Sequence, residues 1–250
     1  MKWALVTGGA KRLGKACALE LARAGWNIAI QFNSSREAAE ATVAEIQALG
    51  RSAAGIECDL SRTNAPMALI DTAMQATQGQ LRALVNCAAL FEHDTPERID
   101  PDLFARHMQV NALAPAMLAS AFANAAPKSE RLMVVNFLDF KLAAPYPDHF
   151  SYTMSKYALM GATEMLARAL APHVRVNAVA PGYVLPAPGQ SEDDFKRLHD
   201  EATPLKNGAT PEDVAKAVRY LIESPAVTGQ TIYVDSGLRF LSHERDFAFR

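Results

Sequence analysis

The sequence predicts an α/β protein with one Rossmann-like domain, a doubly wound sheet of about seven parallel strands with helices on both faces. Short β-branched or apolar runs alternate with longer alanine-rich stretches of helical pattern along the 250 residues, and this alternation is typical of a parallel sheet covered by helices. Half of the residues are hydrophobic and 21% are charged, so the chain has enough apolar material for a sizeable core. No linker, repeat or low-complexity stretch divides residues 1–250, and we therefore expect a single domain.

The first half of the chain supplies four strands and three helices in alternation. The expected order is strand Trp3–Val6, helix Leu13–Ala24, strand Asn27–Phe32, helix Arg36–Leu49, strand Ala53–Cys58, helix Pro66–Thr77 and strand Ala83–Asn86. Ligands of such sheets bind beyond the carboxyl ends of the strands, near the point where the strand order switches. We therefore look for a site in the loops that follow the strands.

The second half continues the alternation with one irregular stretch. The expected order is helix Pro101–Asn124, strand Arg131–Phe137, helix Tyr152–Ala171, strand Arg175–Ala180, helix Pro211–Ser224 and strand Thr231–Val234. Prolines and glycines interrupt residues 181–210, which contain one short polar helix candidate, Glu192–Glu201. Long loops of this kind often cover a binding site, so we expect a substrate loop or lid, with an ordinary surface excursion as the alternative.

Charge and cysteine usage exclude several classes of function. The net charge is −2 with acidic and basic residues interspersed, which argues against a nucleic-acid partner. Cys17, Cys58 and Cys87 are isolated and odd in number, so they are expected to be core residues in a reducing compartment, with no metal site. The chain has no signal-peptide pattern and no apolar run of about 20 residues. We expect a cytoplasmic protein with no membrane partner.

A glycine-containing turn joins the first strand to the first helix. It reads Thr7-Gly8-Gly9-Ala10-Lys11-Arg12-Leu13-Gly14. Glycines let the backbone approach a pyrophosphate, and the N-terminus of a helix attracts its charge. Turns of this kind also serve as plain connectors. The position of this one favours cofactor binding, with Gly8, Arg12 and Leu13 among the expected contacts.

A second pattern carries groups capable of chemistry. Tyr152 and Lys156 are four residues apart, so in a helix they lie on one face, and a nearby ammonium is expected to lower the pKa of the phenol and make it a proton donor. An amphipathic helix surface is the alternative for such a pair. Asp139 precedes Tyr152 by 13 residues. An ionised carboxylate only accepts hydrogen bonds, so it suits a substrate that presents N–H groups better than the developing oxyanion of a ketone.

These motifs resemble the short-chain dehydrogenase/reductase superfamily over almost the whole chain. The turn is similar to T-G-x-x-x-G-x-G, with Arg12 in place of the middle glycine, and Tyr152 and Lys156 match the catalytic pair. The resemblance implies that Lys156 binds the nicotinamide ribose and that Asn111 supports a water beside this lysine. It further implies cofactor contacts, at the adenine or around the nicotinamide, from Asp59, Leu60, Asn86, Ala88, Pro181 and Gly182.

The end of the second strand indicates the cofactor. NAD-selective sites place a carboxylate there for the ribose 2′-hydroxyl, whereas this chain has Asn33, Ser34 and Ser35 with no carboxylate before Glu37. Amide and hydroxyl donors near Lys11, Arg12 and Arg36 suit a 2′-phosphate, because cations and N–H or O–H donors bind phosphate well. The expected cofactor is NADPH.

Within the superfamily, Arg12 and Asp139 together resemble the pteridine reductases and dihydromonapterin reductases, since most short-chain reductases have a serine at the position of Asp139. The resemblance implies that Phe91 stacks the pterin ring, that Tyr146 lines the substrate pocket, and that Asp139, Tyr152 and Lys156 are catalytic. The implied reaction is the NADPH-dependent reduction of a 7,8-dihydropterin, of dihydromonapterin or dihydrobiopterin type, with dihydrofolate as a further substrate. Ala89 and Ser34 depart from serine and arginine positions of some pteridine reductases.

Two other functions stay open from the sequence. One is a generic NADPH-dependent carbonyl or 3-oxoacyl reductase, and the other is a non-catalytic NADP-binding sensor. The resemblance also implies a homotetramer. Phe247 and Phe249 would be unusual in a solvated tail, so we expect residues 238–250 to pack at a subunit interface.

Overall fold

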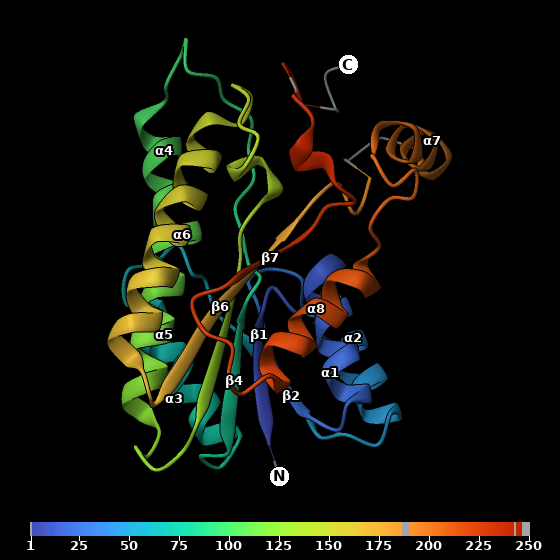
Figure 1. Cartoon of the computed structure of the whole chain (residues 1–250). Helices are drawn as coiled ribbons and strands as arrows, with labels where there is room; N and C mark the ends of the chain where they lie inside the picture. Colours follow the sequence, from blue (N-terminus) through green and yellow to red (C-terminus); the bar gives the residue numbers. More distant parts are fainter. Residues whose placement is uncertain (1, 187–190, 243, 247–250) are drawn as a thin grey trace.

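The computed structural model describes residues 2–186, 191–242 and 244–246 and forms one seven-stranded parallel sheet (Figure 1). The strand order is β3-β2-β1-β4-β5-β6-β7. This confirms the predicted α/β class and the parallel arrangement. The strands are β1 Trp3–Thr7, β2 Asn27–Phe32, β3 Ala53–Glu57, β4 Leu81–Asn86, β5 Leu132–Phe137, β6 Val174–Pro181 and β7 Thr231–Val234.

Helices cover both faces of the sheet, as Figure 1 shows. On one face lie α1 Arg12–Arg23, α2 Arg36–Ala48 and α8 Pro211–Glu223, with α1 packed on α8. On the other face lie α3 Ala65–Ala76, α4 Pro101–Met108, α5 Ala114–Ala125 and α6 Phe150–Leu170, with α3 packed on α5. The strand order reverses between β1 and β4, so the carboxyl ends of these two strands flank the crevice where such folds bind ligands.

Each face of the sheet has its own apolar core, because successive side chains of a strand point to opposite faces. On β1, Ala4 and Val6 join the core beneath α1, α2 and α8, whereas Leu5 joins the core beneath α3 and α5. Phe122 of α5 is fully buried in the second core. The two cores hold the sheet rigidly beneath the loops at its carboxyl edge.

The expected helix Pro101–Asn124 is interrupted by one turn of π-helix, Gln109–Leu113, between α4 and α5. Pro115 supplies the physical reason, because it has no N–H to donate to the carbonyl four residues earlier. The other predicted boundaries differ from the structure by a few residues, as is usual at helix and strand ends.

Three short elements lie beyond the carboxyl edge of the sheet. They are the 3-10 turn Phe140–Leu142, helix α7 Glu192–Ala202 and the 3-10 turn Leu238–Phe240. Helix α7 stands where a short polar helix was predicted and projects away from the sheet (Figure 1). Its role as a lid stays a prediction. Within the described ranges, none of the helices has the length and apolarity needed to cross a membrane.

Candidate active site

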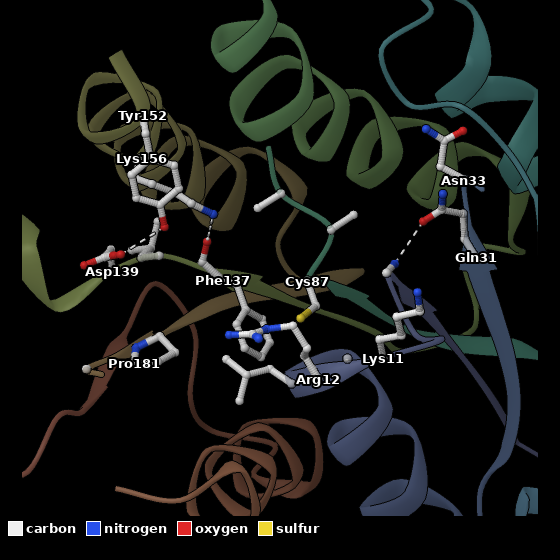
Figure 2. A pocket seen from close by; sticks show the side chains of 17 residues that line it. Lys11, Arg12, Gln31, Asn33, Cys87, Phe137, Asp139, Tyr152, Lys156 and Pro181 are labelled. Atoms are coloured by element: carbon white, nitrogen blue, oxygen red, sulfur yellow. Dashed lines mark hydrogen bonds between the residues drawn. The ribbon is translucent and has the colours of Figure 1, made fainter. Parts of the chain in front are cut away.

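The three predicted catalytic residues meet at the carboxyl ends of β5 and β6 (Figure 2). Asp139 follows β5 and caps the turn Phe140–Leu142, with its Oδ1 accepting a hydrogen bond from Lys141 N at 2.9 Å. Tyr152 lies in the first turn of α6 and donates its hydroxyl to Asp139 Oδ2 at 2.9 Å. Lys156 lies one turn further on, and its Nζ donates to Phe137 O at 2.7 Å. The spacing of 13 and four residues therefore produces one contiguous polar group.

Burial sets the protonation of this group. It raises the pKa of Asp139 above its ordinary value, and burial together with the neighbouring carboxylate raises that of Tyr152 well above 10. The expectation that Lys156 lowers the pKa of Tyr152 is wrong, because Lys156 Nζ bonds to Phe137 O and lies 5.5 Å from the centre of the tyrosine ring. Asp139 and Tyr152, called the acid pair below, therefore keep their protons to a higher pH than the same side chains would in water. Burial also lowers the pKa of Lys156 to about 8.

A cavity of about 450 Å³ runs from this acid pair to the glycine turn and the end of β2 (Figure 2). It brings together residues of α1, β2, β5, α6 and β6 with residues of the loops after β1 and β4, which are far apart in the sequence. Of the residues predicted for the site, those that line the cavity are Gly8, Arg12, Leu13, Asn33, Ala88, Asp139, Tyr152, Lys156, Pro181 and Gly182.

The glycine turn has the geometry that close approach of a phosphate requires. Gly8 has φ +63°, and a Cβ there would lie 3.0 Å from Ala88 Cα. A Cβ on Gly14 would lie 2.2 Å from Gly8 O. Arg12 itself has φ +51°, so it adopts the left-handed conformation for which the family motif has a glycine. Compared with the family motif, the turn keeps the left-handed conformation at this position and carries an additional positive charge.

The first turn of α1 suits an anion. Its N-cap residue, Lys11, makes no side-chain capping bond, and the turn contains no acidic residue. The N–H groups of a helix N-terminus and the positive end of its dipole bind phosphate. Lys11, Arg12 and Gly14 of this turn all line the cavity. The turn thus fits the pyrophosphate of a dinucleotide.

Gln31 is a cavity residue that the sequence reasoning missed. Its Oε1 accepts a hydrogen bond from Gly8 N at 2.9 Å, and its Nε2 donates to Cys58 O at 2.7 Å. It therefore ties the glycine turn to the end of β3. A glutamine between apolar residues near the end of a predicted strand was the available signal.

The preference for NADPH is supported by two cationic side chains at the cavity, instead of the three considered from the sequence. Lys11 and Arg12 line the cavity beside Asn33, whereas Arg36 pairs with Glu57 and lies over the ring of Phe32. Asp139, at the opposite end, is the carboxylate among the residues that line the cavity. The end near β2 is therefore positively charged, which suits a 2′-phosphate.

Several predicted cofactor contacts do not line the cavity, and their roles stay predictions. Asp59 Oδ1 accepts hydrogen bonds from Ser61 N and Oγ, which lower the pKa of Asp59. Leu60 is buried in the core, and Asn86 Nδ2 donates to Asn136 Oδ1 at 2.9 Å. Ser34 and Ser35 form the turn that precedes α2.

Asn111 lies in the π-helical turn and is hydrogen-bonded to the backbone of the loop after β4. Its Oδ1 accepts from Leu90 N at 2.8 Å, and its Nδ2 donates to Leu90 O at 2.9 Å and to Ser155 Oγ at 3.0 Å. It therefore connects the loop that carries Phe91 to helix α6, which carries Tyr152. The predicted water beside Lys156 stays a prediction.

The two aromatic residues predicted for the substrate lie in different surroundings. Phe91 is 56% exposed, with its ring 4.1 Å from that of His149 and 4.7 Å from that of Tyr152, centre to centre. Tyr146 is buried, and its hydroxyl contacts Tyr183 and Asp246 instead of the cavity. Phe91 therefore stands beside the acid pair, whereas Tyr146 faces the C-terminal segment. Phe247 and Phe249 of that segment lie outside the described residues.

Comparison with known proteins gives a consistent family. The family model described as enoyl-(acyl carrier protein) reductase matches residues 8–239. The 3-oxoacyl-[acyl-carrier-protein] reductase FabG of Staphylococcus epidermidis is 30% identical over 250 residues, covering 95% of this chain and 98% of the relative.

Two solved structures are more similar in sequence. FolM alternative dihydrofolate reductase 1 from Brucella suis, in complex with NADP, is 38% identical with a TM-score of 0.91, covering 98% of both chains. The protein of the same name from Brucella canis, also with NADP, is 37% identical with a TM-score of 0.89, covering 99% of this chain and 98% of that one. Because the family model spans most of the chain, this protein belongs to the short-chain dehydrogenase/reductase superfamily and is an oxidoreductase.

Proposed function

We propose that this protein catalyses the NADPH-dependent reduction of a 7,8-dihydropterin to the tetrahydropterin, with dihydromonapterin or dihydrobiopterin as the substrate type and dihydrofolate as a further substrate. The observation that carries the proposal is the hydrogen bond of 2.9 Å between Tyr152 and Asp139. A carboxyl group at this position serves a substrate that gains a proton on nitrogen, because its oxygens accept hydrogen bonds from N–H groups and burial raises its pKa.

The residues that line the cavity are suited to hold NADPH. The turn Gly8–Gly14 and the N-terminus of α1 would bind the pyrophosphate, and Lys11, Arg12 and Asn33 would bind the 2′-phosphate. Lys156 would hold the nicotinamide ribose, with Pro181 and Gly182 beside the nicotinamide. When bound, NADPH supplies the hydride that goes to the pterin ring carbon.

The chain's own residues deliver the proton. Tyr152 donates to Asp139, and burial raises the pKa of both groups, so the pair holds its protons to a higher pH than the two side chains would in water. The pair would protonate the ring nitrogen next to the reduced carbon, and Asp139 would then accept an N–H of the pterin edge. Phe91 stands beside Tyr152, where its exposed ring would stack on the flat heterocycle.

The comparisons support two candidate substrates. The name of the two Brucella proteins, at 37% and 38% identity, supports a pterin or folate. The name of the FabG relative, at 30% identity, supports a 3-oxoacyl substrate as the second candidate. Asp139 favours the first, because once the pair has given up its proton the carboxylate can accept an N–H of the pterin, whereas beside the oxyanion formed from a ketone or thioester it would oppose the negative charge. A non-catalytic sensor has no support from these oxidoreductase relatives.

A single experiment separates these candidates. NADPH oxidation is followed with dihydromonapterin, dihydrobiopterin, dihydrofolate, a 3-oxoacyl thioester and a panel of ketones. We expect turnover with at least one dihydropterin and a kcat/KM at least about tenfold above that for any ketone or thioester, a preference of about 1.4 kcal/mol. Ketone or thioester turnover without dihydropterin turnover would refute the proposal and favour the second candidate.

We further propose a homotetramer located in the cytoplasm. The assembly follows the usual state of the superfamily. The location is supported by Cys17, Cys58 and Cys87, which are free thiols, as expected in a reducing compartment.

A further inference from the structure

We infer that Arg245 and Asp246, in the C-terminal segment 244–246, are positioning residues of the active site. Their contacts hold in place the loop 139–149, which presents the Asp139 carboxyl group. The inference concerns the geometry of the acid pair and rests on the proposed function only for the substrate used in the assay. Both residues contact other residues of the same chain, which the expectation of a tail at a subunit interface did not include.

The first of these contacts is made with a buried carboxylate of the loop. Asp148 has a side chain that is 1% exposed, and it accepts hydrogen bonds from Arg245 Nε at 2.8 and 3.1 Å. It also accepts one from Asp246 N at 2.8 Å. A buried carboxylate without such partners is strongly destabilising. The C-terminal segment therefore satisfies a charge that lies four residues before Tyr152.

The second contact joins two loops of the site. The Asp246 carboxylate is buried and accepts hydrogen bonds from Tyr146 Oη at 2.7 Å and Tyr183 Oη at 3.1 Å. Tyr146 belongs to the loop after β5. Tyr183 directly follows Gly182, which lines the cavity. One carboxylate of the C-terminal segment thus holds the loops after β5 and after β6 together.

Lys141 transmits both contacts to Asp139. Its ammonium is buried, donates to Asp148 O and lies 3.9 Å from the centre of the Tyr146 ring. The same residue's backbone N–H holds Asp139 Oδ1 at 2.9 Å. Movement of Asp148 or Tyr146 therefore moves the residue that orients the catalytic carboxyl group.

The charges of Arg245 and Asp246 also favour their contacts with the loop 139–149. Burial lowers the pKa of the Lys141 ammonium to about 8, and the charges of Asp139, Asp246 and Asp148 partly oppose this shift. Without Arg245 and Asp246, the Asp148 carboxylate loses its guanidinium partner and Lys141 loses one of its carboxylates. Both changes are unfavourable in a buried site. Residues 143–149, which connect the Phe140–Leu142 turn to α6, form neither helix nor strand of their own.

The experiment compares point variants of the full-length enzyme. Arg245→Gln and Asp246→Asn are tested against the matched control Arg168→Gln, which breaks an exposed ion pair with Glu164 on α6 (2.8 Å). We expect the two C-terminal variants to lower kcat at saturating NADPH and dihydropterin about tenfold or more, because small displacements of catalytic groups are costly. The Kd for NADPH should stay within about twofold, a difference of roughly 0.4 kcal/mol. Arg245→Lys, which keeps the positive charge and N–H donors, should retain more of the wild-type kcat than Arg245→Gln.

A second readout needs no substrate. The carboxyl ¹³C resonance of Asp139, assigned with Asp139→Asn, reports how this group titrates, and the C-terminal variants should shift its midpoint. With substrate present, they should also shift the matching limb of the kcat–pH profile, whereas Arg168→Gln should leave both unchanged. A lower Tm with wild-type kcat, pH profile and Asp139 titration would show a merely structural role and overturn the inference. If the wild type reduces ketones only, the proposed function fails and the same comparison is made with the ketone.

Discussion

Asp139 is the residue on which the substrate assignment depends. Its carboxyl group accepts a hydrogen bond from Lys141 N on one oxygen and from the Tyr152 hydroxyl on the other, so it orients the phenol, and burial raises its own pKa. A serine hydroxyl at this position is shorter and neutral. It could replace neither the two-sided hydrogen bonding nor the acid.

We therefore predict that Asp139→Ser lowers kcat/KM for the dihydropterin at least about 100-fold, the contribution expected of a positioned acid–base group. Asp139→Asn, which keeps the shape but cannot supply the acidic proton, should lose a similar amount. Stopped-flow NADPH oxidation measures the effect, and unchanged NADPH fluorescence on binding shows that the cavity is intact. Full dihydropterin turnover by Asp139→Ser would remove the main support for the pterin assignment.

Arg12 combines a strained backbone with a useful charge. Its φ of +51° disfavours a residue with a Cβ, and its Nη2 lies 3.3 Å from Pro186 O at the cavity. We predict that Arg12→Gly raises the free energy of unfolding by roughly 1 kcal/mol relative to Arg12→Ala. Both variants should bind NADPH about tenfold more weakly, the effect of one lost charge-assisted hydrogen bond.

Urea unfolding and NADPH titration separate the two contributions of Arg12, with NADH titration as the control for general damage. Equal NADPH affinity in Arg12→Ala and the wild type would show that this cation does not contact the 2′-phosphate.

Lys156 makes stability depend on pH. Burial lowers its pKa from 10.5 to about 8, so between these values the unfolded chain binds more protons and stability rises with pH. Below pH 8 both states are protonated and the full cost of burying the ammonium remains. The stability that this depressed pKa provides is therefore present at high pH and lost as pH falls through about 8.

We predict that the wild type gains about 2 kcal/mol relative to Lys156→Met between pH 8 and pH 10. Comparing the two proteins cancels the tyrosines and cysteines, which titrate in the same range. Urea unfolding at four pH values measures the difference, with Lys216→Met on the exposed face of α8 as the matched control. A difference that does not change with pH would show that Lys156 titrates normally in the folded protein.

At the residue scale, the groups that could be predicted are those whose chemistry and spacing are local. Asp139, Tyr152 and Lys156 lie within 18 residues of one another and share one loop and one helix. The contacts of Gln31 and Asp246 could not be predicted, because their hydrogen bonds join residues 27 and 100 positions apart. The direction of the Tyr152 pKa was wrong because neither burial nor the partner of Lys156 is visible in a four-residue spacing.

At the scale of elements, the π-helical turn Gln109–Leu113 links the loop after β4 to α6 through Asn111. Such turns are often found at functional sites. The sequence pattern predicted an uninterrupted helix over Pro101–Asn124 although Pro115 lies inside it, because helical periodicity alone does not show which carbonyl loses its donor.

We predict that Asn111→Ala lowers the free energy of unfolding by about 2 kcal/mol, because it leaves the N–H and C=O of Leu90 without their partner. The loop should also become more mobile, so that KM for the dihydropterin rises through the displaced Phe91. Urea unfolding and steady-state kinetics measure the two effects, and Asn124→Ala on the exposed side of α5 is the control. If Asn111→Ala were as stable as the wild type, water would replace the hydrogen bonds of Asn111 to Leu90 without a loss in the free energy of unfolding.

At the scale of the whole molecule, the class and the parallel sheet followed from the alternation of apolar runs and helical stretches. The order of the strands did not, because the pairing of β1 with both β2 and β4 depends on packing between distant segments. The two-sided core explains why the prediction succeeded. The five strands β1, β2, β4, β5 and β6 are mostly apolar and buried along their length, so local hydrophobicity identifies them regardless of their neighbours.

The exposed side of α6 bears on the proposed tetramer. Met154 and Met165 are 41% and 67% exposed, and they lie 11 residues apart, close to three full helical turns, so they share one face. Ala158 and Gly161 lie between them on that face, and a Cβ at Gly161 would meet nothing within 4 Å. Small residues flanked by methionines allow a second helix to approach closely, which suits a symmetric contact between copies of the chain.

We predict that Met165→Glu converts the tetramer into smaller species, because the two-fold axis of such a contact brings the new carboxylates of both copies close together within an apolar patch. Size-exclusion chromatography with light scattering measures the mass, and Leu49→Glu at the end of α2, where the apolar side chain is 39% exposed, is the control. A tetramer that survives Met165→Glu would move the interface away from this face of α6. A monomeric wild type would instead show that the inherited expectation of a tetramer is wrong for this chain.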